Sequence, residues 1–353
     1  MPLSTSRSVI RAVAATEFWY GATGLDMVNG LRSLDWDVQQ VNIRNFFNTT
    51  SGFMSRVARR AVRSTASRYY NSAIRRAISD SNAQVLFTVK GAEIDSETLR
   101  WCADHGVIKT IFYPDVAFNH TGVDEEQFGN YDLVITTKSY HVNYMKNQIG
   151  AEKVHHIPHG YSDMIYRDIP PVEERDYRWD FAYVGNASRH KFDYLLEVKL
   201  QMPELTMIIV GSGWKQMAEG TALATDVIGY SLTGDHLAAI SRLSRINLAI
   251  HFGVTNSLGW EDLVSRRTFE IPAYGGFMLH VDNAEVRGLY DVPSEIDVFD
   301  TPVGLVEKVQ YYLPRAKLRA QMVQCAKRRC VPAYGYVRRA EQLDTLVREL
   351  LNV

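Results

Sequence analysis

The chain has 353 residues, which at about 150 residues per domain predicts two domains of ordinary size. With 46% hydrophobic and 22% charged residues, its composition is that of a soluble globular protein and excludes disordered, collagen-like and coiled-coil chains. Lysine and arginine together number 39 and aspartate and glutamate 40, so the net charge is −1 and no overall positive field favours nucleic acid.

The cysteines and the apolar runs both indicate a cytoplasmic protein. The three cysteines are an odd number, and Cys325 and Cys330 have the spacing of neither a zinc knuckle nor a redox pair. Arg11 interrupts the apolar stretch near the start, so no signal peptide is expected. No apolar run reaches the roughly 18 residues that a transmembrane helix needs.

In the first half of the chain, short β-rich runs alternate with longer amphipathic stretches, a pattern typical of a parallel sheet covered by helices. The predicted strands cover residues 8–15, 36–43, 83–90, 108–114, 132–137 and 154–160. The predicted helices cover about 22–34, 51–80, 95–105 and 139–148.

The same alternation restarts after the proline- and charge-rich segment 168–178. Strands are predicted at 179–186, 205–211, 246–252 and 277–281, and the helices between them include 233–244 and 265–274. Three helical segments follow from Thr301, the last at about 336–351. Two successive α/β units predict two Rossmann-like domains that face one another.

Residues 265–280 are the most informative stretch. Ser265 is placed to cap a helix, and the free N–H groups at that helix start, with Arg267 beside them, suit a phosphate. Glu270, one turn further on, can accept hydrogen bonds from two neighbouring sugar hydroxyls. Together these groups predict a nucleotide diphosphate at the end of the sheet, with Glu270 on the ribose. The alternative is an ordinary capped helix with an exposed arginine and a surface glutamate.

The pattern Ser-x-Arg-x-Phe-Glu-Ile-Pro-Ala-x-Gly-Gly at 265–276, with the acidic segment 293–296 and Tyr-x-Tyr-x-x-Arg at 334–339, resembles the group 1 type glycosyltransferases related to spore maturation proteins. Segments 87–91, 113–115, 131–137 and 156–162 are similar as well, so the likeness covers roughly 80–353. It implies the GT-B fold. An acceptor-binding domain would span 1–165, a nucleotide-sugar-binding domain 166–335, and a final helix at 336–353 would pack back on the first domain.

The resemblance also implies roles for single residues. Glu270 would bind the ribose, and Arg267 would lie near the diphosphate or the donor sugar and act in catalysis. Related retaining enzymes carry Glu-x7-Glu, and Asp262 stands here in place of the first glutamate. Because the shorter Asp262 reaches the donor sugar less well, the stereochemistry stays open, with retention preferred.

Glycine-containing turns after other strands of the second domain add to the predicted donor site. Two cations open the helix after the first strand and can meet phosphate oxygens, and the glycines permit close backbone approach. Ordinary tight turns of a Rossmann-like domain are the alternative. The residues assigned to the donor are Gly185, Asn186, Arg189, Lys191, Gly211, Gly229, Tyr230, Ser265, Arg267 and Glu270.

Turns after strands of the first domain supply the candidates for the acceptor, because ligands of open α/β sheets bind at the carboxyl ends of strands. Asp115 can act as a base toward an acceptor hydroxyl, although an aspartate after proline is often only a turn former. The other candidates are Tyr20, Gly21, Gly24, Lys90 and His120.

No metal or other cofactor is expected. Asp35 and Asp37 have the spacing of a divalent-metal motif but open a strand after a helix. The histidines at 155, 156 and 159 have no cysteine or acidic ligand set near them in the sequence.

Residues 51–79 contain seven arginines and no acid, with apolar residues at helical spacing. Such a helix can hold anionic lipid headgroups at the inner face of the membrane or a phosphate-bearing acceptor. The alternative is an amphipathic helix with solvated arginines.

We therefore expect a hexosyltransferase-type enzyme that moves a sugar from a nucleotide-sugar donor to a hydroxyl of a carbohydrate, lipid-linked or small-molecule acceptor. The rival expectation is a two-domain nucleotide-sugar-binding protein or epimerase without transferase activity.

Overall fold

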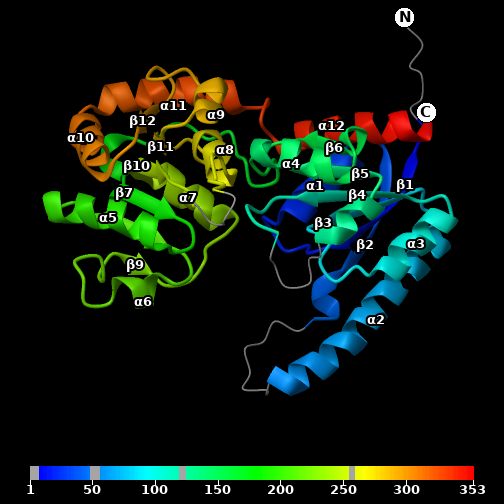
Figure 1. Ribbon diagram of the computed structural model, residues 1–353. Helices are drawn as coiled ribbons and strands as arrows, with labels where there is room; N and C mark the ends of the chain where they lie inside the picture. The colour runs from blue at the N-terminus through cyan, green and yellow to red at the C-terminus, as the bar shows by residue number, and fades with distance from the viewer. Residues whose placement is uncertain (1–7, 48–55, 119–124, 254–258) are drawn as a thin grey trace, which may run out of the picture. The chain divides into compact units, whose positions relative to one another are not determined.

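The computed structural model describes residues 8–47, 56–118, 125–253 and 259–353, and gives no side-chain environment for 56–61. The chain divides into two compact units (Figure 1). Unit 1 comprises Met1–Pro158 and Tyr336–Val353, and unit 2 comprises His159–Gly335. The boundary falls before the predicted residue 165 because Tyr161 and Ile165 pack with Phe269 and Tyr274 of unit 2.

Unit 1 is built on a six-stranded parallel sheet of order β2-β1-β3-β4-β5-β6. Its strands are β1 (Ile10–Thr16), β2 (Trp36–Asn42), β3 (Val85–Val89), β4 (Ile108–Tyr113), β5 (Leu133–Thr136) and β6 (Val154–His156). Its helices are α1 (Thr23–Arg32), α2 (Arg56–Ser81), α3 (Ser96–Asp104), α4 (Ser139–Ile149) and α12 (Tyr336–Leu351). In the described ranges, short 3-10 helices lie between them at η1 (Ile43–Asn45), η2 (Glu125–Asn130) and η3 (Ala151–Lys153).

The two faces of this sheet are covered by different helices. Side chains alternate along β1, so Ala12 and Ala14 pack in one core with α1 and α12, while α2 and α3 pack on the other face. Because helices cover both faces of the sheet, side chains that point to either face are buried. Strands β1 and β3 are therefore apolar almost without interruption.

Helix α12 joins unit 1 although unit 2 precedes it in the chain. A Cβ atom at Gly30 of α1 would lie 2.7 Å from Ala340 Cβ, so the two helices approach as closely as only glycine allows. Trp36 Nε1 donates a hydrogen bond of 2.7 Å to Asp344 Oδ1. Leu343 and Val347 are fully buried in the same core.

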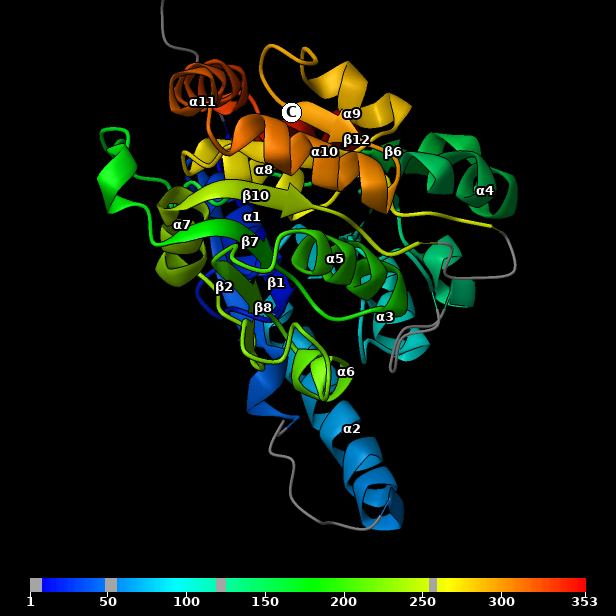
Figure 2. The same ribbon diagram turned by 90° about the vertical axis from the view of Figure 1, so that its left-hand side faces the viewer.

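Unit 2 repeats the plan with a six-stranded parallel sheet of order β12-β11-β10-β7-β8-β9. Its strands are β7 (Trp179–Val184), β8 (Met207–Val210), β9 (Val227–Ile228), β10 (Ser244–Ala249), β11 (Met278–Val281) and β12 (Asp297–Phe299). Its helices are η4 (Glu174–Asp176), α5 (Arg189–Gln201), α6 (Trp214–Ala218), α7 (Asp235–Leu243), α8 (Arg266–Ala273), α9 (Ala284–Leu289), α10 (Pro302–Tyr312) and α11 (Ala316–Cys330). Helices α5 and α10 lie on the opposite side of the sheet from α7 and α8 (Figures 1 and 2).

The predicted α/β fold with two parallel sheets is therefore confirmed, with changes at strand ends. Strand β10 ends at Ala249, so the predicted strand 246–252 is too long at its carboxyl end. The sequence analysis missed β12, whose first residue, Asp297, is unusual in a strand; Lys308 and Tyr312 hold its carboxylate at 2.6 and 2.8 Å. None of the helices in the described ranges is long and apolar enough to span a bilayer.

The polar segment before β7 is fixed to unit 2 by a buried arginine. Arg319, 1% exposed, donates to both carboxylate oxygens of Glu174 at 2.9 and 2.8 Å. Arg245 also pairs with Glu174, at 2.6 Å, and with Asp180 at 2.7 Å. The carboxylate thus compensates a guanidinium that has been removed from water.

We expect Glu174→Ala to lower the free energy of unfolding by about 2 kcal/mol, because two charge-assisted hydrogen bonds to a buried arginine are lost. Urea denaturation followed by tryptophan fluorescence measures this. The matched control is Glu173→Ala, since Glu173 is exposed and pairs with the exposed Arg175 at 2.9 Å. Equal denaturation midpoints for both variants would contradict the expectation.

Candidate functional site

The turns after β7 and β8 touch each other at the carboxyl end of the unit 2 sheet. A Cβ atom at Gly211 would lie 2.2 Å from the carbonyl oxygen of Gly185, so no side chain fits there. Trp214 Nε1 donates to the same carbonyl at 2.7 Å, and Ser212 N donates to Asn186 Oδ1 at 3.3 Å. Close backbone approach thus requires a glycine at position 211, one of the glycines that the sequence assigned to the donor.

Arg267 lies against the turn after β7. A Cβ atom at Gly185 would be 2.7 Å from Arg267 Nη1, and Arg267 Nη2 donates to Ile250 O, at the end of β10, at 3.3 Å. Arg267 belongs to the first turn of α8, whose N-cap is Ser265. The guanidinium therefore lies over the ends of two neighbouring strands, where the dipole of α8 is also positive.

Two buried polar atoms at this point have no hydrogen-bond partner within the described residues: Arg267 Nε and Tyr183 Oη. The Tyr183 ring lies below the guanidinium, with Arg267 Cζ 5.6 Å from the ring centroid. Burial raises the pKa of Tyr183, so its hydroxyl keeps its proton. Buried donors are normally satisfied, and these two are suited to an anionic ligand.

Lys191 is a fully buried cation on α5. Its Nζ donates to Asn186 O at 3.0 Å and lies 3.5 Å from the centroid of the Phe252 ring. Burial, reinforced by the positive charge of Arg267 and opposed by Asp262, lowers the pKa of Lys191 to about 7. The ammonium is thus close to its titration point at neutral pH.

Glu270 and Asp262 are both buried, at 5% and 7% exposed. Arg266 pairs with Glu270 Oε1 at 2.8 Å, an i,i+4 contact on α8. Glu270 and Arg267 line the same small cavity against the ends of β7 and β10. Asp262 lies near enough to Lys191 and Tyr183 to affect both electrostatically.

The remaining donor candidates lie in different surroundings and are not all close to Arg267 and Lys191. Arg189 is exposed and pairs with Asp193 at 3.0 Å, so the structure does not bring it to Arg267 and Lys191. Gly229 follows β9, and a Cβ there would lie 2.5 Å from Lys215 Cγ. Tyr230 beside it is 63% exposed.

In unit 1, two candidates from neighbouring strands meet. Lys90, which follows β3 with a φ of 67°, pairs with Asp115, which follows β4, at 2.7 Å. A Cβ atom at Gly24 would lie 2.5 Å from Thr16 Cγ2, so α1 starts directly against the end of β1. Gly21 has a φ of 92° and Tyr20 is 40% exposed. His120 lies outside the described residues.

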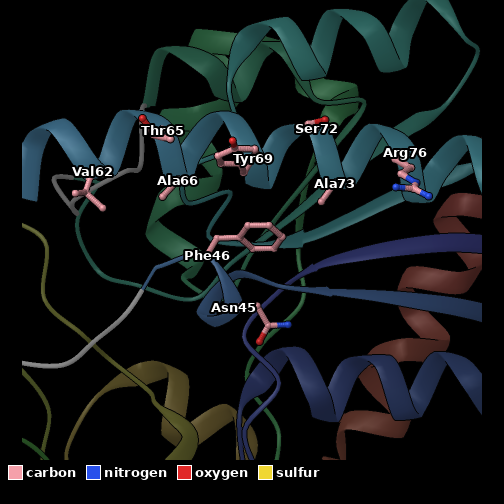
Figure 3. Close-up of a pocket in the computed structure, with 9 residues that line it drawn as sticks. All are labelled: Asn45, Phe46, Val62, Thr65, Ala66, Tyr69, Ser72, Ala73 and Arg76. Atoms are coloured by element: carbon pink, nitrogen blue, oxygen red, sulfur yellow. The ribbon is translucent and has the colours of Figure 1, made fainter.

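Helix α2 runs past the edge of the unit 1 sheet (Figures 1 and 2). One face of it and the ring of Phe46 line a groove of about 790 Å³ (Figure 3). Arg63 pairs with Glu93, Arg75 with Glu97 and Arg76 with Asp80. Acids from outside residues 51–79 thus neutralise part of the positive charge that the sequence shows there. Membrane contact stays a prediction, and residues 51–55 lie outside the described ranges.

Within the described ranges, no three histidine, cysteine or acidic side chains are grouped so that they could hold a metal ion. Asp35 has a φ of 63° in the turn before β2, and Asp37 is exposed on that strand. His155 Nε2 lies 3.1 Å from Glu152 O. Catalysis without a metal stays a prediction.

Sequence analysis did not name Tyr183, His251 and Phe252, which lie against Arg267 or Lys191 in the structure. His251 and Phe252 were placed inside a strand, whereas they follow its end and therefore lie where ligands of such sheets bind. The uninterrupted apolar run of this strand ends at Ile250. This change from apolar to polar residues is the sequence signal that could have placed His251 just after the strand.

Comparisons with known proteins agree with this geometry. Residues 192–345 match the family model described as glycosyl transferase-like. No curated protein matches the sequence. Sucrose-phosphate synthase from Thermosynechococcus elongatus has a similar structure, with a TM-score of 0.68 and 12% identity over 98% of this chain and 100% of that chain.

Two further solved structures bear on the function. Anabaena HepE in complex with UDP-glucose has a TM-score of 0.61 at 11% identity, covering 98% of this chain and 100% of that one. A UDP-N-acetylglucosamine 2-epimerase from Listeria monocytogenes, described as putative, has a TM-score of 0.54 at 10% identity, covering 98% and 97%. These identities bear on the fold alone.

The fold is GT-B, and the matched segment contains α8 with its arginine and glutamate. The match of residues 192–345 to the glycosyl transferase-like family agrees with the resemblance to group 1 type glycosyltransferases in the sequence.

Proposed function

We propose that unit 2 binds a nucleoside-diphosphate sugar with its diphosphate at Arg267 and Lys191, and that a sugar is transferred from it to an acceptor hydroxyl. The main support for this proposal is that the two cations both lie at the Gly185 turn. At the same place, Arg267 Nε and Tyr183 Oη have no hydrogen-bond partner in the described ranges. Uridine diphosphate is the first nucleotide to test, because HepE, which is similar in structure, binds UDP-glucose.

The proposed chemistry is stabilisation of the leaving diphosphate. When the bond from the anomeric carbon to the phosphate oxygen breaks, negative charge grows on that oxygen. Fixed donors in a water-poor site stabilise this charge without reorganising. Lys191 can also donate a proton there, because its pKa lies near 7.

Glu270 is proposed to accept hydrogen bonds from the ribose hydroxyls. Its carboxylate is held in one orientation by Arg266 and faces the cavity it shares with Arg267. Asp262 is the proposed contact to the donor sugar, which favours a retaining reaction. Arg189 is left out of this arrangement because it pairs with Asp193 at the surface.

For the acceptor, we propose that Asp115 is the base and Lys90 its partner. The ammonium of Lys90 keeps the carboxylate in place at the end of β4. A proton from the acceptor hydroxyl would pass to Asp115 as the new glycosidic bond forms. Tyr20, Gly21 and Gly24 are the further proposed acceptor contacts, and the proposed acceptor is a carbohydrate, a lipid-linked compound or a small molecule. Contact of residues 51–79 with an anionic membrane is a separate proposal.

The test is a transfer assay with UDP-glucose, UDP-N-acetylglucosamine and GDP-mannose in excess EDTA. We expect release of nucleoside diphosphate from one donor at the same rate with EDTA as with added magnesium, since cations of the chain take the role of a metal. Release that requires magnesium or manganese would contradict the metal-free mechanism.

The same assay separates the transferase from the epimerase that one structural neighbour suggests. An epimerase would change the sugar while it remains attached to the nucleotide, and no nucleoside diphosphate would be released in proportion to turnover. Chromatography of the nucleotide sugars distinguishes the two products.

A further inference from the structure

A row of buried side chains runs from Arg267 into unit 2 through two histidines. His251 Nδ1 lies 3.5 Å from Arg267 Nη2, at the outer limit of a hydrogen bond. On its other side, His251 Nε2 lies 3.1 Å from His280 Nε2, which lies 2.9 Å from Thr268 Oγ1. His251 is 2% exposed and His280 is fully buried.

The position of the hydrogen on His280 follows from its neighbour in the chain. His280 Nδ1 lies 2.7 Å from Val281 O, and because a carbonyl oxygen only accepts, Nδ1 carries the hydrogen. Burial lowers the pKa of His280 to about 4, so the ring is neutral at physiological pH. Its Nε2 is therefore an acceptor only.

This fixes the tautomer of His251. Two bare ring nitrogens 3.1 Å apart would repel each other, so His251 Nε2 must carry a hydrogen and donate it to His280. His251 Nδ1 is then bare and faces a guanidinium that can only donate. The opposite tautomer would place lone pair against lone pair at one end and donor against donor at the other.

We infer that His251 and His280 are positioning residues that orient Arg267 toward the diphosphate. His280 sets the tautomer of His251, and His251 with Ile250 O holds one edge of the guanidinium. The remaining edge is directed to the Gly185 turn. The inference rests on the proposed function, since it concerns the strength with which that site binds a diphosphate.

Two substitutions of His251 separate positioning from simple packing. In His251→Asn the amide oxygen takes the place of Nδ1 and still accepts from Arg267. In His251→Gln the amide nitrogen takes the place of Nε2 and still donates to His280, but the acceptor for Arg267 is lost. Asparagine is the smaller side chain, so a packing role predicts the greater loss for His251→Asn.

The measurement is calorimetric titration of the full chain with UDP and with uridine, with thermal unfolding as a check of folding. We expect UDP to bind about tenfold more weakly to His251→Gln than to wild type and close to normally to His251→Asn. Uridine, which has no phosphate, should bind equally to all three. Equal UDP affinities for both variants, or a greater loss in His251→Asn, would overturn the inference.

Failure of the proposed function gives a different result. If the wild type binds none of UDP, GDP, ADP, CDP and dTDP, the donor site itself is wrong and the positioning role falls with it. If the wild type binds one of these and both variants bind it equally well, only the positioning role is refuted.

Discussion

Arg267→Ala is expected to lower kcat for sugar transfer about 100- to 1,000-fold, the loss typical of removing one oriented donor from a site of developing charge. A large effect is expected because the guanidinium of Arg267 lies over the Gly185 turn and its Nε has no partner within the described part of the chain. Initial rates at saturating donor measure the effect.

Arg189→Ala is the matched control for this variant. Arg189 also belongs to the start of a helix near the site, but it is exposed and pairs with Asp193. Its removal should change kcat by less than about twofold, as expected for a surface ion pair. Similar losses in both variants would mean that the cations act through general charge rather than through position. An unchanged kcat in Arg267→Ala would contradict the mechanism.

The affinity for a nucleoside diphosphate is expected to fall about tenfold for each pH unit above about 7. Lys191 has a pKa lowered to about 7 by burial, so in the ligand-free protein it loses its proton above that pH. A bound diphosphate stabilises the ammonium and raises its pKa, so binding takes up a proton. The contribution of Lys191 to the affinity is therefore fully present below pH 7. It is lost as the pH rises from 7 toward the pKa of Lys191 in the complex.

Lys191→Met tests the assignment, because methionine keeps much of the side-chain length but cannot titrate. Its affinity should be lower at pH 6 and flat from pH 7 to 9. The slope between pH 7 and 9 reports Lys191, since the second ionisation of the phosphate, with a pKa of about 6, lies mostly below this range. Calorimetric titrations of UDP across this range give both curves. Parallel slopes for wild type and variant would show that another group titrates.

The difference between Arg189 and Lys191 shows which features of the candidate site could be predicted from the sequence and which could not. The sequence places both cations at the start of one helix and makes them equivalent candidates. At about 100° per residue, however, positions two apart lie on nearly opposite sides of a helix. Only the packing of α5 on the sheet decides that Lys191 is buried and Arg189 is in solvent.

The histidine pair shows a limit of a different kind. The strands β10 and β11 could be predicted from their apolar runs, but not their pairing in parallel register, with Ala249 opposite His280. This register brings His280 beside His251. The contact of Lys90 with Asp115 depends in the same way on the pairing of β3 and β4. Local sequence pattern thus predicted most of the elements and supplied candidate site residues, whereas the contacts between side chains required the tertiary structure.

Helix α12 makes unit 1 discontinuous, with unit 2 as an insertion between β6 and the final helix. Tyr161 N donates to Tyr334 O at 3.1 Å, so the two ends of the insertion lie side by side and unit 2 can close on itself. During synthesis the apolar surface of α1, which holds Met27 and Leu31, must wait for α12 until unit 2 has been made. Nascent unit 1 therefore keeps this apolar surface uncovered until nearly the whole chain has been made, although its first strand leaves the ribosome early.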